Sequence, residues 1–143
     1  MTKIICAILL SSLVLVSCEQ VKIDKDKERI NSICDKFMQN FRDGKISEAI
    51  QQLKQNSVIT NSTLDTLQIT IQKQMNNILS GYGKILSYEF ITERKIKDIV
   101  AKRLYILKFE KYYLKFDFIV YKSAAGWTIT NFNYNEDLIE LLY

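Results

Sequence analysis

The apolar residues in the first half of the chain recur at the spacing of an α-helix. From about residue 25 to residue 42 they form one stripe, which is typical of a helix that buries one face. The stripe consists of Ile30, Ile33, Phe37 and Phe41. Gly44 follows the stripe and suits the end of a helix, so the pattern predicts a first helix over about 25–42.

Two further helices are predicted before the pattern changes. The first of these is short and covers about 47–54. Ser62, with Asp65 three residues later, resembles a capping box, so a longer helix is expected to begin directly after Ser62 and to cover about 63–80. Its core-facing positions are Leu64, Leu67, Ile71, Met75 and Ile78.

From Lys84 onward the apolar period is two, the period of β-strands. Runs rich in aromatic and β-branched residues predict strands over about 84–94, 99–109, 112–122 and 127–134. The connections between them are short, which favours an antiparallel meander. We therefore expect one α+β domain over 25–143, with three N-terminal helices packed on a curved four-stranded antiparallel sheet. Residues 136–143 are expected to add one or two helical turns.

The alternation also predicts the register of the second and third strands. If Phe109 lies opposite Tyr112, one face of the sheet becomes strongly apolar. The opposed pairs are then Leu107 with Leu114, Tyr105 with Phe116, and Arg103 with Phe118. The other face carries Lys102, Lys108, Lys115 and Asp117, and we expect it to meet solvent.

A similar argument applies to the first and second strands. Pairing Arg94 with Ile99 places three large side chains on the apolar face, and a shift by one residue would bury polar side chains instead. The three are Leu86, Tyr88 and Phe90, and the polar ones are Ser87 and Glu89.

The first eighteen residues have the pattern of a secretory signal. Lys3 supplies a positive charge, a short apolar segment over 4–16 follows, and Glu19 begins a charged stretch. The segment is shorter than the roughly 20 apolar residues of a transmembrane helix. Leu15-Val16-Ser17-Cys18 resembles the lipobox of bacterial lipoproteins, which implies cleavage before Cys18 and attachment of a diacylglyceryl group to its thiol. The alternative is a buried N-terminal helix or strand.

This resemblance divides the chain into a signal peptide (1–17), a lipidated tether (18–24) and the domain (25–143). Buried acyl chains such as palmitate would hold the protein at a membrane. The residue after Cys18 is Glu19. An aspartate at this position would resemble the inner-membrane retention signal of enteric-type bacteria. We therefore favour the periplasmic face of the outer membrane, with the cell membrane as the alternative.

Cys34 is the one cysteine in the predicted domain, so no disulfide is expected within it. Its position beside Ile33 and Phe37 favours a buried, inert thiol. The alternative is a reactive thiol, which requires a basic partner or a helix N-terminus nearby.

Charge and composition exclude several functions. Cleavage after residue 17 would leave 19 basic and 16 acidic side chains, a formal charge of +3 that does not point to nucleic acid. Lys22, Lys25 and Lys27 are interpreted as an ordinary solvated helix face, and attraction to an anionic membrane surface is the alternative. The chain contains no histidine, which excludes histidine bases and histidine metal sites. We expect no metal and no cofactor.

Two segments resemble a known superfamily. Phe41-Arg42-Asp43-Gly44-Lys45, with Ala49 and Leu53 after it, resembles the helix–break–helix that opens many nuclear transport factor 2-like domains. Gly126-Trp127-Thr128-Ile129 resembles their last-strand signature. The resemblance covers about 25–135 and implies a cone-shaped fold, shared with ketosteroid isomerase, that has a pocket between sheet and helices. A fold does not imply a reaction, and we align no acid onto the inward face, so no catalytic residue is predicted.

The predicted pocket-lining residues are Tyr88, Arg103, Tyr105, Trp127 and Asn131. Arg103 lies on the apolar face, where a charge needs compensation. It either anchors an anionic ligand group, or it reaches the sheet edge, stacks on aromatic rings and pairs with a carboxylate. Trp127 is either core or a platform for a ligand.

Three functions fit this sequence. The first is a non-enzymatic, membrane-anchored binding or interaction module of the cell envelope, whose partner is an envelope protein or a small apolar ligand. The second is an isomerase- or hydratase-like enzyme that uses the cone pocket. The third is an immunity-type lipoprotein that blocks a partner protein. An acid within hydrogen-bond reach of a tyrosine in an open pocket would favour the enzyme, and a filled cone would favour an interaction surface.

Overall fold

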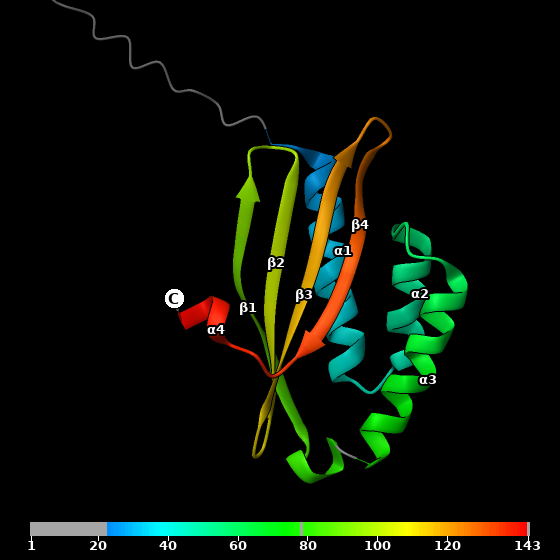
Figure 1. Cartoon of the computed structure of the whole chain (residues 1–143), viewed down its shortest axis with the longest axis vertical. Coiled ribbons are helices and arrows are strands. Elements are labelled where there is room, and N and C mark those ends of the chain that lie inside the picture. Colours follow the sequence, from blue (N-terminus) through cyan, green and yellow to red (C-terminus); the bar gives the residue numbers. More distant parts are fainter. Residues whose placement is uncertain (1–22, 78, 143) are drawn as a thin grey trace, which may run out of the picture.

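The computed structural model describes residues 23–77 and 79–142, which form helices and one antiparallel sheet (Figure 1). The predicted signal peptide and Cys18 lie outside these residues. The elements are α1 (Lys25–Arg42), α2 (Ile46–Asn56), α3 (Asn61–Asn77), the 3-10 helix η1 (Leu79–Tyr82), β1 (Ile85–Ile96), β2 (Val100–Phe109), β3 (Tyr113–Ser123), β4 (Gly126–Asn135) and α4 (Ile139–Leu142). The expected α+β architecture is confirmed.

Helix α1 begins and ends where the apolar stripe and Gly44 predict. The Asp24 side chain accepts a hydrogen bond from the backbone N–H of Lys27 (3.2 Å), which caps the first turn. Gly44 follows the helix with a φ of +74°, a conformation that glycine adopts without strain. The Gly44 N–H donates to the carbonyl of Phe41 (3.0 Å), so the chain turns sharply into α2.

The predicted start of α3 is wrong by two residues. The helix begins at Asn61, and the hydroxyl of Thr60 accepts from the backbone N–H of Thr63 (3.4 Å). Asp65 does not complete a capping box; its carboxylate pairs with Lys54 of α2 (2.5 Å). The chain turns early because the N–H of Val58 donates to the carbonyl of Ile129 in β4, which fixes the loop against the sheet.

The four strands are hydrogen-bonded in the order β1-β2-β3-β4, each antiparallel to the next. The predicted register between β2 and β3 is confirmed in full. The pairs are Leu107 with Leu114, Tyr105 with Phe116, and Arg103 with Phe118. No irregularity interrupts this pair of strands, so simple alternation is sufficient to predict it.

The predicted register of β1 is wrong. Arg94 lies opposite Lys102 instead of Ile99, and two irregularities interrupt the pairing, between Ile85 and Ser87 and between Phe90 and Thr92. An inserted residue moves the side chains beyond it to the other face of the strand.

These two irregularities change which side chains of β1 face the helices. Ile85 packs against the core and Leu86 is exposed, contrary to the prediction for Leu86. Tyr88 and Phe90 do lie beside the ring of Tyr105, at the margin of the inner face. Past the second irregularity, Glu93 lies directly opposite Arg103. A carboxylate therefore occupies the inner face, which the sequence pattern did not predict.

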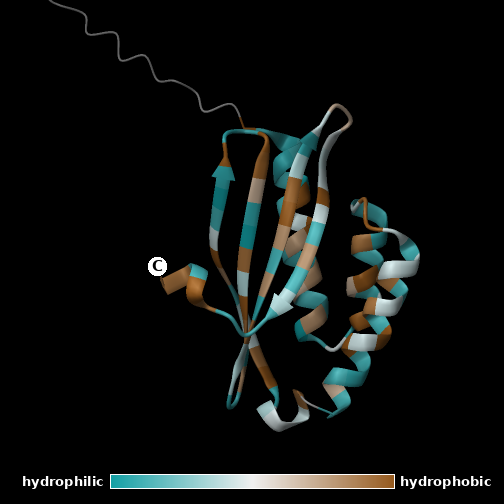
Figure 2. Ribbon diagram, viewed as in Figure 1, coloured by the Kyte–Doolittle hydropathy of each residue, from teal (hydrophilic) through white to brown (hydrophobic). Residues whose placement is uncertain are grey.

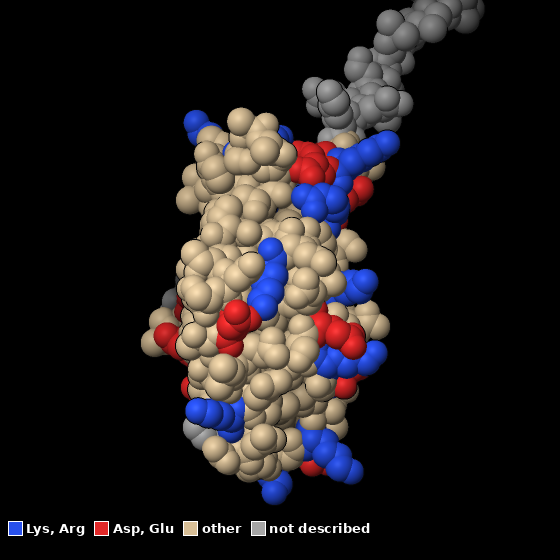
Figure 3. Space-filling view, turned by 90° about the vertical axis from the view of Figure 1, so that its right-hand side faces the viewer, with Lys and Arg blue, Asp and Glu red and all other residues tan. Residues whose placement is uncertain are grey.

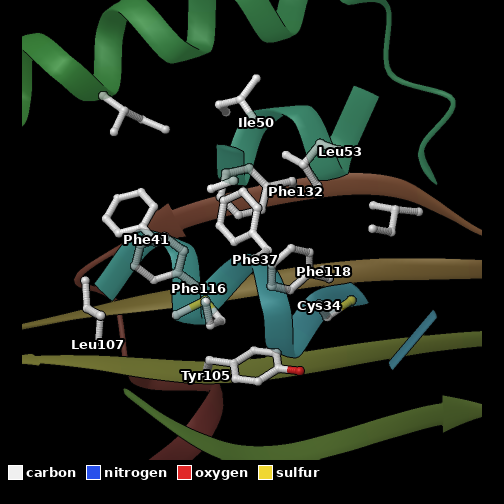
Figure 4. Packing of buried hydrophobic residues seen from close by; sticks show 14 of the residues in the cluster. Cys34, Phe37, Phe41, Ile50, Leu53, Tyr105, Leu107, Phe116, Phe118 and Phe132 are labelled. Atoms are coloured by element: carbon white, nitrogen blue, oxygen red, sulfur yellow. The ribbon is translucent and has the colours of Figure 1, made fainter. Parts of the chain in front are cut away.

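Aromatic side chains fill the space between the sheet and α1. Helix α1 crosses the inner face of the sheet, α2 packs on α1 and β4, and α3 packs on α2 (Figure 1). The apolar sides of α2 and α3 turn inward (Figure 2). Phe37 is fully buried, and its ring centroid is 5.3 Å from Phe118 and 4.8 Å from Phe132 (Figure 4). Phe41 lies 4.9 Å from Phe116 in the same layer.

The outer face of the sheet is more covered than the sequence suggests. The C-terminal segment folds back so that Glu140 of α4 pairs with Lys102 (2.6 Å) and Lys115 (2.5 Å). Lys115 and Asp117 are consequently only 4% and 5% exposed, although both were expected to meet solvent. In the described part of the chain, no helix is both long and apolar enough to cross a membrane.

Candidate functional site

A group of polar side chains lies where α1 passes over β1 and β2. It consists of Lys27 and Asp35 from α1, Glu93 from β1, and Arg103 and Tyr105 from β2. We call this group the Arg103 cluster. Four of its side chains are largely buried, and that of Asp35 is about half exposed at 49%.

Arg103 occupies the centre of the cluster and uses each of its nitrogens. Its Nη1 donates to Glu93 Oε2 (2.8 Å), its Nε to the Tyr105 hydroxyl (3.0 Å), and its Nη2 lies 3.3 Å from Asp35 Oδ1. The guanidinium also stacks 4.5 Å from the ring centroid of Phe90. This geometry corresponds to the second interpretation of Arg103, in which carboxylates and aromatic rings compensate the charge.

Lys27 and a further hydrogen bond of Tyr105 complete the network. Lys27 Nζ donates to the same Glu93 oxygen (2.7 Å) and to Asn31 Oδ1 (2.5 Å). The Tyr105 hydroxyl donates its single proton to Asp35 Oδ1 (2.5 Å). Throughout residues 23–77 and 79–142, every buried side-chain nitrogen and oxygen has a hydrogen-bond partner.

Burial is the main influence on pKa values in the Arg103 cluster. It raises the pKa of Tyr105 far above its ordinary 10.0, and the hydrogen bond to Asp35 acts in the same direction. Burial alone would raise the pKa of Glu93, but the hydrogen bonds from Lys27 and Arg103 outweigh it and hold that pKa below 4.5. At neutral pH the cluster thus contains a Glu93 carboxylate between two cations, beside a neutral tyrosine.

An acid within hydrogen-bond reach of a tyrosine is one mark of the isomerase-like function. A catalytic tyrosine of that kind must aim a free O–H at substrate. The proton of Tyr105 is already directed at Asp35, and fully buried side chains such as Phe118 pack against its ring (Figure 4). The Tyr105 hydroxyl is thus engaged within the protein, and its ring is enclosed by the core.

Hollows do occur on the surface of the described part, and the one near Tyr134 is lined in part by the core residues Leu79 and Leu114. One of about 670 Å³ lies between the start of α2 and α3, and one of about 160 Å³ lies near Tyr134. A third, of about 1040 Å³, lies at the N-terminal end of α1 and includes Lys27, Lys122 and Trp127. Tyr88, Arg103 and Tyr105 line none of the three.

Trp127 is buried at the N-terminal end of α1, away from Tyr105. Its indole Nε1 donates to Asp24 (3.1 Å), and its backbone N–H donates to Asp26 (2.5 Å). Gly126 permits this approach because it has a φ of +117° and a Cβ there would lie 2.5 Å from Asp26 Oδ2. The Gly-Trp pair of the last strand therefore ties the sheet to the first turn of α1, which fits the core interpretation of Trp127.

Asn131 does not lie on the inner face, contrary to expectation. The pairing of β4 with β3 shifts between Ile119 and Val120, so Thr130 is an extra residue in β4. The inner positions change there from Ile129 to Phe132, and Asn131 is exposed on the other side.

Three members of the cluster, Lys27, Asp35 and Glu93, are not among the residues predicted for the site. One signal was available, because Lys27, Asn31 and Asp35 follow one another at intervals of four and form a polar ridge beside the apolar stripe of α1. No comparable signal marks Glu93, whose inward position depends on the second irregularity of β1. Within the described residues, no group of three or more histidine, cysteine, aspartate or glutamate side chains could hold a metal ion.

The Cys34 thiol lies close to the cluster but is fully buried. Burial raises its pKa to about 12, so the thiolate is scarce at neutral pH. We expect Cys34 of the native protein to react with a maleimide at least about 100-fold more slowly than in urea, because reaction requires opening of the fold. Labelling of native protein at the denatured rate would contradict the buried, inert assignment.

Comparison with known proteins supports the fold and gives no family. No protein-family model matches the sequence, and no curated protein matches it. Among solved structures, a domain of unknown function with a cystatin-like fold from Nostoc punctiforme has a TM-score of 0.55 at 11% identity, over 84% of this chain and 83% of that one. A proposed NTF2-like transpeptidase from Campylobacter jejuni has a TM-score of 0.46 at 10% identity, over 71% of this chain and 97% of that one.

The chain thus has a cystatin-like α+β fold, as the sequence resemblance implies. At these identities the likeness concerns the fold alone.

Proposed function

We propose that this protein is a lipid-anchored component of the bacterial cell envelope whose domain acts as a non-enzymatic interaction module. The observation that carries the non-enzymatic part is the filled cone. Phe37, Tyr105 and Phe118 are fully buried against one another where related enzymes need an open pocket. A module that binds through its outer surface needs no such pocket.

The anchor is proposed from the lipobox-like sequence at Cys18 and is consistent with where the domain begins. Asp24 caps α1, so only five residues separate Cys18 from the cap. The domain would be held directly at the membrane surface. A protein partner would then also be at, or within reach of, that membrane, as both an envelope interaction module and an immunity-type protein require.

The anchor is tested by replacing Cys18 with alanine in cells that are given labelled palmitate. We expect the wild-type protein to carry label and to sediment with membranes. The Cys18→Ala protein should lose both properties, because no thiol is available for the lipid. Cys34→Ala is the matched control, since this thiol is buried, and it should keep its label. Palmitate on the Cys18→Ala protein would refute the proposed anchor.

A further inference from the structure

The two hairpins that connect β1 to β2 and β3 to β4 lie at one end of the sheet, beside the start of α1 (Figure 1). This shared position follows from the meander topology and from the contacts of Asp24 with Lys122 and with Trp127. We call the surface formed by residues 96–99, residues 123–126 and Ile23 the hairpin end. The chain that leads toward Cys18 leaves the domain here.

Several apolar side chains are exposed at the hairpin end. Ile96 and Ile99 flank the β1–β2 turn and are 70% and 49% exposed, and Ile23 is 62% exposed. Ala124 and Ala125 are exposed at the tip of the second hairpin. Single exposed apolar residues are ordinary on protein surfaces, whereas several at one end mark a contact site.

Charges of both signs lie at this end, including the exposed Lys97 and Asp98 of the β1–β2 turn. Asp24 pairs with Lys122 (2.9 Å), and Asp26 pairs with Arg29 (3.0 Å). Figure 3 shows acidic and basic side chains together near this end. The turn itself contains Lys97 at a φ of +49°, a conformation in which glycine is more common, so a cation occupies the tip.

We propose that the hairpin end lies against the lipid bilayer, with Ile96 and Ile99 in the boundary between headgroups and acyl chains. The inference rests on the proposed anchor at Cys18. Residues 19–23 can span at most about 18 Å when fully extended, so the anchor holds this end close to the bilayer. Apolar side chains held there enter the boundary region, about 5–10 Å deep.

The orientation makes a prediction for the opposite end. Strand β2 has ten residues and separates the hairpin end from the β2–β3 turn by about 33 Å. The β2–β3 turn, with the end of α3, should therefore face away from the membrane and be available to a protein partner.

The test places a fluorescent probe on single cysteines of the lipidated full chain. Cys34 is buried and the Cys18 thiol carries lipid, so an introduced cysteine is the reactive one. The variants are Ile96→Cys, Ile99→Cys and the matched control Lys111→Cys, which is also exposed at a hairpin turn but at the opposite end. The proteins are inserted into vesicles of phosphatidylethanolamine and phosphatidylglycerol that contain a nitroxide-labelled lipid.

We expect strong quenching of the probes at positions 96 and 99 and no quenching at position 111. Equal signals at all three positions, whether quenched or not, would overturn the proposed orientation. Failure of the anchor gives a different result, because the protein would then not co-sediment with the vesicles. The Cys18→Ala protein provides that reference.

Discussion

Replacing Phe37 with alanine is expected to lower the free energy of unfolding by about 4 kcal/mol, since removal of a fully buried phenylalanine costs roughly 3–5 kcal/mol. The Phe37 ring contacts Phe41, Phe116, Phe118 and Phe132, so its loss leaves a cavity in the middle of the cone. Urea unfolding of the purified domain measures the loss. If Phe37→Ala does not fold, Phe37→Leu gives a smaller loss of the same origin.

The same variant tests whether the cone is filled. A dry apolar cavity binds benzene-sized molecules and is stabilised by them. We expect benzene to raise the melting temperature of Phe37→Ala and to leave that of the wild type unchanged. Stabilisation of the wild-type protein by benzene would indicate an open pocket and would contradict the non-enzymatic proposal.

Leu86→Ala is the matched control for Phe37→Ala. Simple alternation predicts an inward Leu86, and truncation of an inward leucine costs about 2–5 kcal/mol. The structure has Leu86 exposed, and a substitution there should change stability by less than about 0.5 kcal/mol. A large loss would support the register predicted from the sequence over the one described here.

The contrast between β2 and β1 explains how much of this fold the sequence predicts. Strand β2 pairs with β3 without interruption, so the alternation of Arg103, Tyr105 and Leu107 determines which side chains turn inward. The same alternation fails in β1 and β4, because β1 contains two inserted residues and β4 contains one. The position of an inserted residue depends on tertiary packing, so it cannot be predicted from the local pattern of apolar residues.

The Arg103 cluster was only half predictable for the same reason. Arg103 and Tyr105 belong to the regular strand, and the need for a counter-charge near Arg103 follows from its burial. The identity of that counter-charge does not follow, since Glu93 reaches the inner face only after the second irregularity of β1. Asp35 comes from α1, and its proximity depends on how the helix crosses the sheet.

Replacing Glu93 with glutamine should lower the free energy of unfolding by about 3 kcal/mol at neutral pH. Removal of one partner from a buried ion pair leaves the other charge uncompensated, which costs roughly 3–5 kcal/mol. Glu93 is the counter-charge of both Lys27 and Arg103, which are 7% and 6% exposed. Asp35 still faces Arg103 in the variant, so the lower part of the range is expected.

Glu89→Gln is the matched control for Glu93→Gln, because Glu89 is on the same strand and is also paired with a lysine. Its partner is Lys108 (3.0 Å), and both side chains are at least half exposed. Exposed pairs of this kind contribute less than about 1 kcal/mol. A loss in Glu89→Gln as large as in Glu93→Gln would show that burial of the cluster is not the cause.

The pH dependence of stability distinguishes the contribution of the Glu93 charge from that of its packing. Because the folded state holds the pKa of Glu93 below 4.5, its carboxylate stabilises the protein above that pH. The stabilisation is lost as the pH falls through the lowered pKa of Glu93, and a glutamine at this position has no such contribution to lose.

The acids Asp24, Asp26 and Glu140 also have lowered pKa values, but they are present in both proteins, so their contributions cancel in the stability difference. The stability difference between wild type and Glu93→Gln should therefore shrink as the pH falls below 4.5. A difference that stays constant would attribute the loss to packing rather than to charge.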